Sequence, residues 1–362
     1  MDNHRPAPLQ NLVAHDCNRM AWRGQTGHYE VWFLTLTHKE SQTGFWIRYT
    51  LESPEPGHGQ PYAELWFCRS SAKAPESNFG IHRRFDIAKL HSQHRPFVVR
   101  IGDADLGHGH ASGALLGDGH TVRWDLHWEG CTTVHRLLPD LIYQNPLGLA
   151  ETVLLSPNHS IFLSGTIEVD GQRYEVTQAP GGQSHLWGKK HAYGWAWARC
   201  NAFSEEGAGK NALSPAVFEA LTVKMRRGPL VIPLTVVSVY PDGLLGDERA
   251  WKEWAYMPFS KAEYRTGTYV LSCAGPRHGV DVRLSCTTED MLRTEYVDPD
   301  GSPAFNHFAG TASCELVLKE RLCPGSPWRP VRTFHCDQAA QFEWAGRAGD
   351  SQVRKRHILL SD

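Results

Sequence analysis

Long apolar segments are absent from this sequence of 362 residues. No stretch reaches the roughly 18 continuous apolar residues that a membrane-spanning helix needs. The first residues, Met1 to Pro8, also lack the apolar run of a secretory signal. We therefore expect a cytoplasmic protein without a transmembrane segment, and contact with a membrane surface stays open.

A charge imbalance and closely paired cysteines are also missing. The 37 basic and 39 acidic side chains give a net charge of -2, so the composition does not favour nucleic acid as a partner. The nine cysteines are scattered without a Cys-x-x-Cys pair, which argues against a disulfide framework or a cysteine-rich zinc site. His108-Gly-His110 has the spacing of a metal-ligand pair but no companion cluster nearby. We expect no metal and no cofactor, and the oligomeric state stays open.

Tryptophan and histidine are abundant, with 13 and 20 residues. Apolar and polar residues alternate along many short segments, as in half-buried antiparallel strands. This alternation predicts strands at 45–52 and 122–129 and hairpins at 161–176 and 221–240. Further strands are expected at 29–37, 62–68, 97–102, 268–273, 280–287, 310–318 and 332–338.

Helical patterns are sparse and are limited to 84–92 and 248–256. Many short strands separated by Gly and Pro favour a sandwich or a barrel, and this length suits two domains. The Pro-Gly-Gly segment 178–183 reads as the loop between them. The predicted fold is all-β, with antiparallel domains at residues 1–180 and 181–362.

Residues 183–203 carry the strongest functional signal. From Trp195 onward, one face of the expected strand carries large side chains: Trp195, Trp197, Arg199, Asn201 and Phe203. The other face carries Ala196, Ala198, Cys200 and Ala202. Because arginine is rarely buried without a partner, we expect the large face to line a cavity or groove. Two tryptophans on one strand are also common in a core, and this alternative stays open.

The same segment resembles a known group of proteins. The pattern Trp187-Gly188, then Trp195-x-Trp197-x-x-Cys200-Asn201-x-Phe203, is similar to tocopherol cyclases and to the wider group of carotenoid 1,2-hydratases and AttH-like proteins. Residues 27–33 and 44–49 resemble an early strand pair of AttH-like proteins. The resemblance implies two lipocalin-like (calycin-like) antiparallel β-barrels packed together. Arg199 departs from the tocopherol cyclases, in which a glutamine is expected.

The resemblance implies an enzyme for a hydrophobic small molecule, a lipophilic isoprenoid-like substrate. It would protonate an alkene in an aromatic-lined pocket, leading to cyclisation, hydration or isomerisation, as a cyclase, hydratase, isomerase or lyase does. Such chemistry needs a buried acid that stays protonated and aromatic faces that stabilise a cation. Candidate catalytic residues are His185, His191, Asp298 and His307. Candidate substrate-binding residues are Trp187, Tyr193, Trp195, Trp197, Arg199 and Asn201.

Other interpretations of these residues stay open. A barrel can serve as a non-catalytic carrier of a hydrophobic ligand, or as a pericyclic cyclase that holds its substrate folded. Asp298 precedes Pro299 and Gly301, which is typical of a plain turn. The histidines also suit ordinary hydrogen-bonded roles. Asp, Glu or His side chains beside Trp195 would favour the enzyme, and an apolar lining would favour the carrier.

Overall fold

The computed structural model describes residues 14–131, 134–137, 152–207, 212–243 and 259–360. Strands dominate these ranges and confirm the all-β prediction. The helical pieces described are short: α1 (Ala14–Cys17), η2 (Pro75–Ser77) and η3 (Ile87–Lys89). Within these ranges, no helix has the length and apolar character to span a membrane.

The helix expected at 84–92 is wrong. Residues up to Asp86 continue a strand, and Asp86 Oδ1 then accepts a hydrogen bond from Ala88 N at 2.8 Å. That contact caps the single turn η3, after which the chain is extended again from Leu90. The second expected helix, 248–256, lies outside the described residues.

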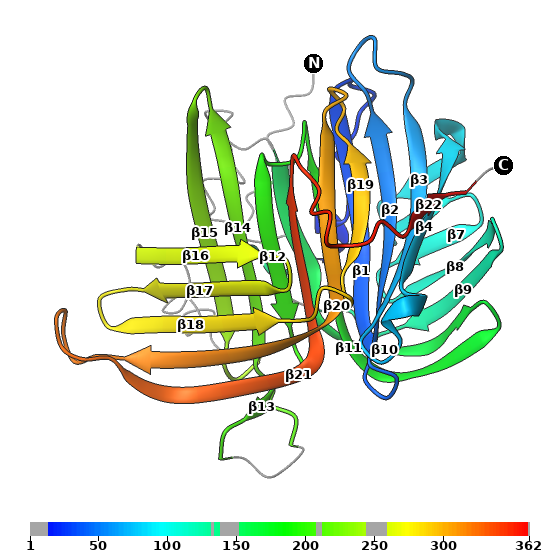
Figure 1. Cartoon of the computed structure of the whole chain (residues 1–362). Helices are drawn as coiled ribbons and strands as arrows, with labels where there is room; N and C mark the ends of the chain where they lie inside the picture. The colour runs from blue at the N-terminus through cyan, green and yellow to red at the C-terminus, as the bar shows by residue number, and fades with distance from the viewer. Residues whose placement is uncertain (1–13, 132–133, 138–151, 208–211, 244–258, 361–362) are drawn as a thin grey trace.

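The first sheet has twelve strands in the order β22-β4-β3-β2-β1-β11-β10-β9-β8-β7-β6-β5 (Figure 1). Its neighbours pair antiparallel except for β22, which runs parallel to β4. The sheet curls around its own core, which includes Trp32, Phe45, Phe67 and Trp124. Its strands are β1 (His28–His38), β2 (Thr43–Ser53), β3 (Tyr62–Ser71), β4 (Phe79–Asp86), β5 (Leu90–Gln93), β6 (Val98–Ile101), β7 (Ala104–Gly107), β8 (His110–Gly117), β9 (His120–His127), β10 (Thr152–Val169), β11 (Gln172–Gly188) and β22 (His357–Leu359).

The second sheet has ten strands, with the main order β15-β14-β12-β21-β20-β18-β17-β16. In addition, β13 pairs with β21, and β19 pairs with β20. The end strands β15 and β16 come into contact, so the sheet nearly closes around a second core. Its strands are β12 (Gly194–Cys200), β13 (Ser204–Glu205), β14 (Val217–Arg227), β15 (Leu230–Tyr240), β16 (Phe259–Arg265), β17 (Thr268–Ala274), β18 (His278–Ser285), β19 (Leu292–Val297), β20 (Pro303–Glu320) and β21 (Arg329–Gly346).

The loop expected at 178–183 is wrong, because these residues form the middle of β11. Their glycines are needed because neighbouring atoms pack too closely for a side chain, and not because the chain turns. A Cβ on Gly182 would lie 2.8 Å from Cζ of the buried Arg199, and one on Gly181 would lie 2.7 Å from Leu163 Cδ1. The chain passes from the first sheet to the second between Gly188 and Gly194. The division into domains 1–180 and 181–362 stays a prediction.

Both sheets contain a long strand pair with the same irregularity. Gln178 on β11 and Gln338 on β21 both have a φ of 49°. The Gln178 N–H donates to Ser164 Oγ on β10 at 3.2 Å, and the Gln338 N–H donates to Ser313 Oγ on β20 at 3.3 Å. The two long strand pairs therefore share the same kind of β-bulge.

The outer faces of the two sheets pack against each other and form what we call the inter-sheet layer. Tyr29, Val31 and Phe33 of β1 and Trp46 and Trp66 of β2 and β3 meet the second sheet there, at Trp195, Trp197, Tyr296 and Phe308. The backbones come closest at Gly44 and Gly310, where a Cβ on Gly310 would lie 2.6 Å from Gly44 Cα. Strands such as β2 are therefore buried on both faces.

Candidate active site

The two faces of β12 separate as the alternation predicts. Ala196, Ala198 and Cys200 lie in the core of the second sheet. The large face is buried in the inter-sheet layer, where Arg199 is 0% exposed and Trp195 is 7% exposed. We expected this face to line a cavity. Two cavities among the described residues, of about 530 and 760 Å³, have other linings.

At one end of this face, His191 and Asp298 form a hydrogen-bonded pair. His191 Nδ1 lies 2.6 Å from Asp298 Oδ1, and the same oxygen accepts the His191 backbone N–H at 3.1 Å. Burial alone would raise the pKa of Asp298, but hydrogen bonds from His191 and Arg347 hold it at about 2. Burial also lowers the pKa of His191, although Asp298 opposes this. The pair therefore consists of a carboxylate and a neutral imidazole whose Nδ1–H donates.

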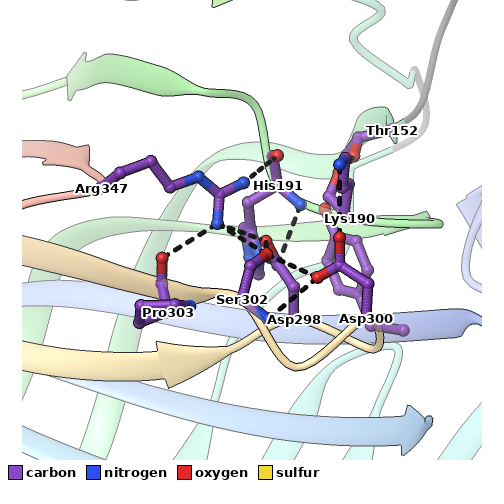
Figure 2. A network of polar contacts seen from close by, with 9 residues as sticks. Thr152, Lys190, His191, Asp298, Asp300, Ser302, Pro303 and Arg347 are labelled. Carbon is purple, nitrogen blue, oxygen red and sulfur yellow. Dashed lines mark hydrogen bonds and ion pairs between the residues drawn. The ribbon is translucent and has the colours of Figure 1, made fainter. Parts of the chain in front are cut away.

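Polar contacts fasten this pair to three chain segments (Figure 2). Arg347 Nη1 donates to Asp298 Oδ2 at 2.6 Å, and its Nη2 donates to the His191 carbonyl at 2.9 Å. Lys190 Nζ donates to Asp300 Oδ2 at 3.3 Å, and the Lys190 carbonyl accepts from Thr152 Oγ1 at 2.8 Å. The turn after β11, the turn after β19 and the end of β21 are thus held as one unit.

Aromatic rings enclose the His191 imidazole. The ring centroids of Tyr29, Trp195 and Tyr296 lie 4.4, 5.1 and 5.5 Å from it, and all three rings are stacked on it. His191 Nε2 makes no hydrogen bond to the described residues, and the side chain keeps 10% of its surface exposed. This nitrogen can therefore accept a proton.

A carboxyl group lies at the Nε1 edge of the Trp195 indole. Trp195 Nε1 donates to Glu343 Oε1 at 2.9 Å, and Asn306 Nδ2 donates to Glu343 Oε2 at 3.3 Å. Burial raises the pKa of Glu343, and the bond from Trp195 offsets this only in part. Glu343 is half-buried, as are its layer neighbours Leu221 and Val223, so this end of the layer remains accessible. Burial thus favours the neutral form of a carboxyl group held beside an indole.

The other end of the large face holds a second polar cluster around Glu219. Trp197 Nε1 donates to Glu219 Oε1 at 2.7 Å, and Arg199 Nη2 lies 3.3 Å from the same oxygen. His159 Nδ1 and His135 Nε2 lie 2.9 and 3.5 Å from Oε2. Burial opposes the charge, but Arg199 and His159 keep the pKa of Glu219 below its usual range.

His135, His159 and Glu219 have the donor types and the proximity of a metal site, with ligand atoms within 4.8 Å of one another. The Arg199 guanidinium already supplies a positive charge to this carboxylate. A divalent cation would add charge beside a fully buried arginine, at a high desolvation cost. The cluster is therefore a buried ion pair of Arg199 and Glu219 flanked by two histidines, and neither ring nitrogen of His159 has hydrogen-bond geometry to a described residue.

His185 lies on the opposite face of β11 from the inter-sheet layer, stacked on Trp32 of the first core at 4.8 Å. Its Nε2 lies 2.8 Å from Glu30 Oε1, and its Nδ1 lies 2.6 Å from the Cys17 carbonyl. Although burial opposes ionisation, bonds from His185 and His28 hold the pKa of Glu30 at about 2. These contacts fasten the N-terminal segment to the first sheet.

The remaining candidates lie apart from His191 and Asp298. His307 is stacked on Trp344 at 4.0 Å; its Nδ1 lies 3.3 Å from the Trp344 carbonyl, and its Nε2 accepts from Asp350 N at 3.0 Å. Trp187 is half-buried, with its ring 4.6 Å from His185. Tyr193 is exposed. The Asn201 amide binds the Ile161 and Gly181 carbonyls, at 3.2 and 3.1 Å.

Sequence reasoning missed Glu343, Glu219 and Tyr29. Each is a polar or amphipathic residue on a strand whose two faces are both covered by protein. Glu343, for example, lies between the buried Phe342 and the half-buried Trp344. A charged residue inside an aromatic strand was the available signal. Alternation of apolar and polar residues usually indicates that the polar face is exposed to solvent, and a charged residue on such a face does not stand out.

Comparison with known proteins adds to this geometry. Two uncharacterised proteins from two strains of Mycobacterium tuberculosis are each 25% identical to this chain over 322 residues, which covers 87% of this chain and 87% of each relative. No family model matches the chain. Neither relative has a named activity that could be compared.

Among solved structures, a candidate AttH protein from Nitrosomonas europaea aligns with a TM-score of 0.50 and 11% identity, over 89% of this chain and 93% of its own. The chain shares the AttH fold. Kievitone hydratase from Nectria haematococca aligns at a TM-score of 0.46, with 13% identity and 88% of both chains covered, too weakly to carry an argument. The predicted likeness to AttH-like proteins is confirmed for the fold, and tocopherol cyclases in particular receive no support.

Proposed function

We propose that this protein is an enzyme that transfers protons to and from a hydrophobic, alkene-containing molecule in the inter-sheet layer. One observation carries the proposal: the Trp195 indole contacts both a neutral imidazole and a carboxyl group whose neutral form burial favours. It stacks on His191 at 5.1 Å and donates to Glu343 at 2.9 Å. Two groups whose environments favour a base and an acid are what such chemistry requires.

In the proposed reaction, Glu343 gives its proton to one alkene carbon, and the positive charge develops on the neighbouring carbon. The faces of Trp195 and Tyr296 stabilise this cation. His191 Nε2 then removes a proton, either from an adjacent carbon or from an attacking water. The first route gives isomerisation or cyclisation, and the second gives hydration. Asp298 fixes the tautomer and orientation of His191 and is a positioning residue.

The other candidates take different roles in this proposal. His185 and His307 have both ring nitrogens near backbone or carboxylate groups and hold their surroundings in place. Arg199 and Trp197 keep Glu219 charged. The substrate then lies on the Trp195 end of the large face, where half-buried Leu221 and Val223 mark the accessible part of the layer.

Proton transfer can be tested without knowing the product. The purified protein is incubated in deuterium oxide with a panel of isoprenoid alkenes, and mass spectrometry follows deuterium entering each compound. We expect incorporation by the natural protein, with losses of about 10²–10⁴-fold in Glu343→Gln and His191→Gln. Incorporation that is unchanged in both variants would contradict the proposal.

His307→Gln is the matched control, because His307 is also buried and its ring nitrogens contact only backbone groups among the described residues. It should keep its incorporation rate wherever the variant remains folded. Mass spectrometry of molecules that co-purify with the protein provides the starting compounds. A bound hydrophobic molecule that never exchanges hydrogen would support a carrier instead.

A further inference from the structure

We propose that Arg48 anchors an oxyanion, a carboxylate, at one end of the apolar ligand. The substrate class would then be a hydrophobic carboxylic acid. The inference rests on the proposed function for the position of the reacting alkene. It arises from a different part of the inter-sheet layer, the face of β2.

Arg48 is a buried cation surrounded by aromatic rings. The side chain points into the layer from the middle of β2 and is 3% exposed. Its Cζ lies 4.3 Å from the ring centroid of Tyr296, 5.5 Å from that of Trp66 and 5.9 Å from that of Trp46. Ring faces attract a cation but accept few hydrogen bonds, so they leave most of its five N–H donors unused.

Arg48 also lacks a counter-ion among the described residues. Its one hydrogen bond there runs from Nε to Thr50 Oγ1 at 2.9 Å, and no ion pair joins it to a described carboxylate. The other buried arginine of the layer, Arg199, is paired with Glu219 at 3.3 Å. A buried guanidinium without a partner is costly, and both terminal nitrogens of Arg48 remain available for a bidentate acceptor.

The neighbouring carboxyl groups do not fill this role. Glu64 forms its ion pair with Arg84, at 3.0 Å. Burial raises the pKa of Glu52 and of Glu343, although the charge of Arg48 opposes this in both, and neither group forms an ion pair with Arg48. The positive charge of Arg48 is therefore available to form an ion pair with an anionic group of the ligand.

The position of Arg48 also suits a molecule that reaches the proposed acid and base. Tyr296 contacts both regions: its ring centroid is 5.5 Å from that of His191 and 4.3 Å from Arg48 Cζ. A ligand with its carboxylate at Arg48 would extend past the edge of Tyr296 toward Trp195. Its polar end would set which double bond meets Glu343.

Hexadecanoic acid, its methyl ester and hexadecyl phosphate test this assignment by quenching of tryptophan fluorescence. We expect the natural protein to bind the acid at least about tenfold more tightly than the ester, and Arg48→Gln to bind the two equally. Arg84→Gln, the same change in an ion-paired arginine on the next strand but one, should keep the preference. Tighter binding of the phosphate than of the acid would identify a phosphate as the anion and overturn the carboxylate assignment.

Stability provides a second readout. Removing an unpaired buried cation should leave the melting temperature of ligand-free Arg48→Gln unchanged or higher, and the acid should stabilise only the natural protein. If Arg48→Gln does not fold, Arg48→Lys retains the charge and should retain the preference for the acid. Equal binding of acid and ester by the natural protein, or binding of neither, would overturn the proposal. Selective binding without hydrogen exchange would contradict the proposed enzyme and leave the anchor standing.

Discussion

The imidazole of His191 and the carboxylate of Asp298 are 107 positions apart in the sequence and 2.6 Å apart in the fold. Asp298 also accepts from Arg347, so three segments converge on one carboxylate. This arrangement fixes the proton of His191 on Nδ1 and leaves Nε2 to act as a base. Two residues that were singled out separately in the sequence thus form one unit.

Replacement of Asp298 by Asn should lower activity by about 10²–10⁴-fold, because the amide can hold the wrong imidazole tautomer. It should also change acid stability. The folded pKa of about 2 lies below the ordinary 3.8, so the carboxylate stabilises the fold above pH 3.8, by ~2 kcal/mol. This contribution is lost as the pH falls through 2. Melting temperatures measured from pH 6 to 2 should fall less steeply in the variant, and parallel curves would contradict this.

Glu343→Gln should separate catalysis from stability. Because burial favours the neutral carboxyl, an amide of the same shape can keep the contacts to Trp195 and Asn306. The free energy of unfolding should change by less than about 1 kcal/mol, while hydrogen exchange into the substrate is lost. Urea unfolding and the exchange assay are measured on the same preparation. A folded variant with full activity would exclude Glu343 as the acid.

Arg199 and Glu219 should behave as a coupled pair. Arg199→Met leaves a buried carboxylate without its main cation, and Glu219→Gln leaves a buried guanidinium. Each should cost about 3–5 kcal/mol of unfolding free energy. The double variant should cost clearly less than the sum, which a double-mutant cycle in urea measures. Additive losses would show that the two groups do not stabilise each other.

The contact between Gly44 and Gly310 should tolerate no side chain. A Cβ on either glycine would collide with the backbone of the other strand, so Gly44→Ala must push the two sheets apart. We expect a loss of a few kcal/mol in stability and weaker ligand binding in the layer. Gly119→Ser is a control for glycine replacement as such, since an added Cβ there meets nothing within 4 Å although its φ of 82° adds strain. Equal losses at Gly44 and Gly119 would contradict the steric argument.

The strands could be predicted from the sequence because successive side chains of a strand point to opposite faces of the sheet, so apolar and polar residues alternate. Residues 45–52 fall in β2, and 122–127 of the strand expected at 122–129 fall in β9. The hairpin expected at 221–240 is β14 and β15. The alternation does not show whether solvent, a ligand or a second sheet covers each face of a strand. The polar face of β2 is therefore buried by a second sheet, and the large face of β12 is buried where we expected a cavity.

The site itself could be predicted only in part, for the same reason. His191, Asp298 and Trp195 stood out as residue types suited to chemistry. Glu343 became a candidate only when its distance to Trp195 was known. The glycines at 181 and 182 indicated a turn, although their small size makes room for Arg199 and Leu163. In each case the deciding neighbour is far away in the sequence.

The last strand, β22, has a consequence for the order of synthesis. It pairs with the edge of β4, and Leu360 just beyond it completes the core of the first sheet. The other strands of this sheet end by Gly188, so a ribosome completes them long before it reaches β22. The first sheet therefore waits with an open edge while the second is translated. Protein cut short before His357 will carry a β4 that pairs only with β3, and its open edge is a ready template for association with other chains.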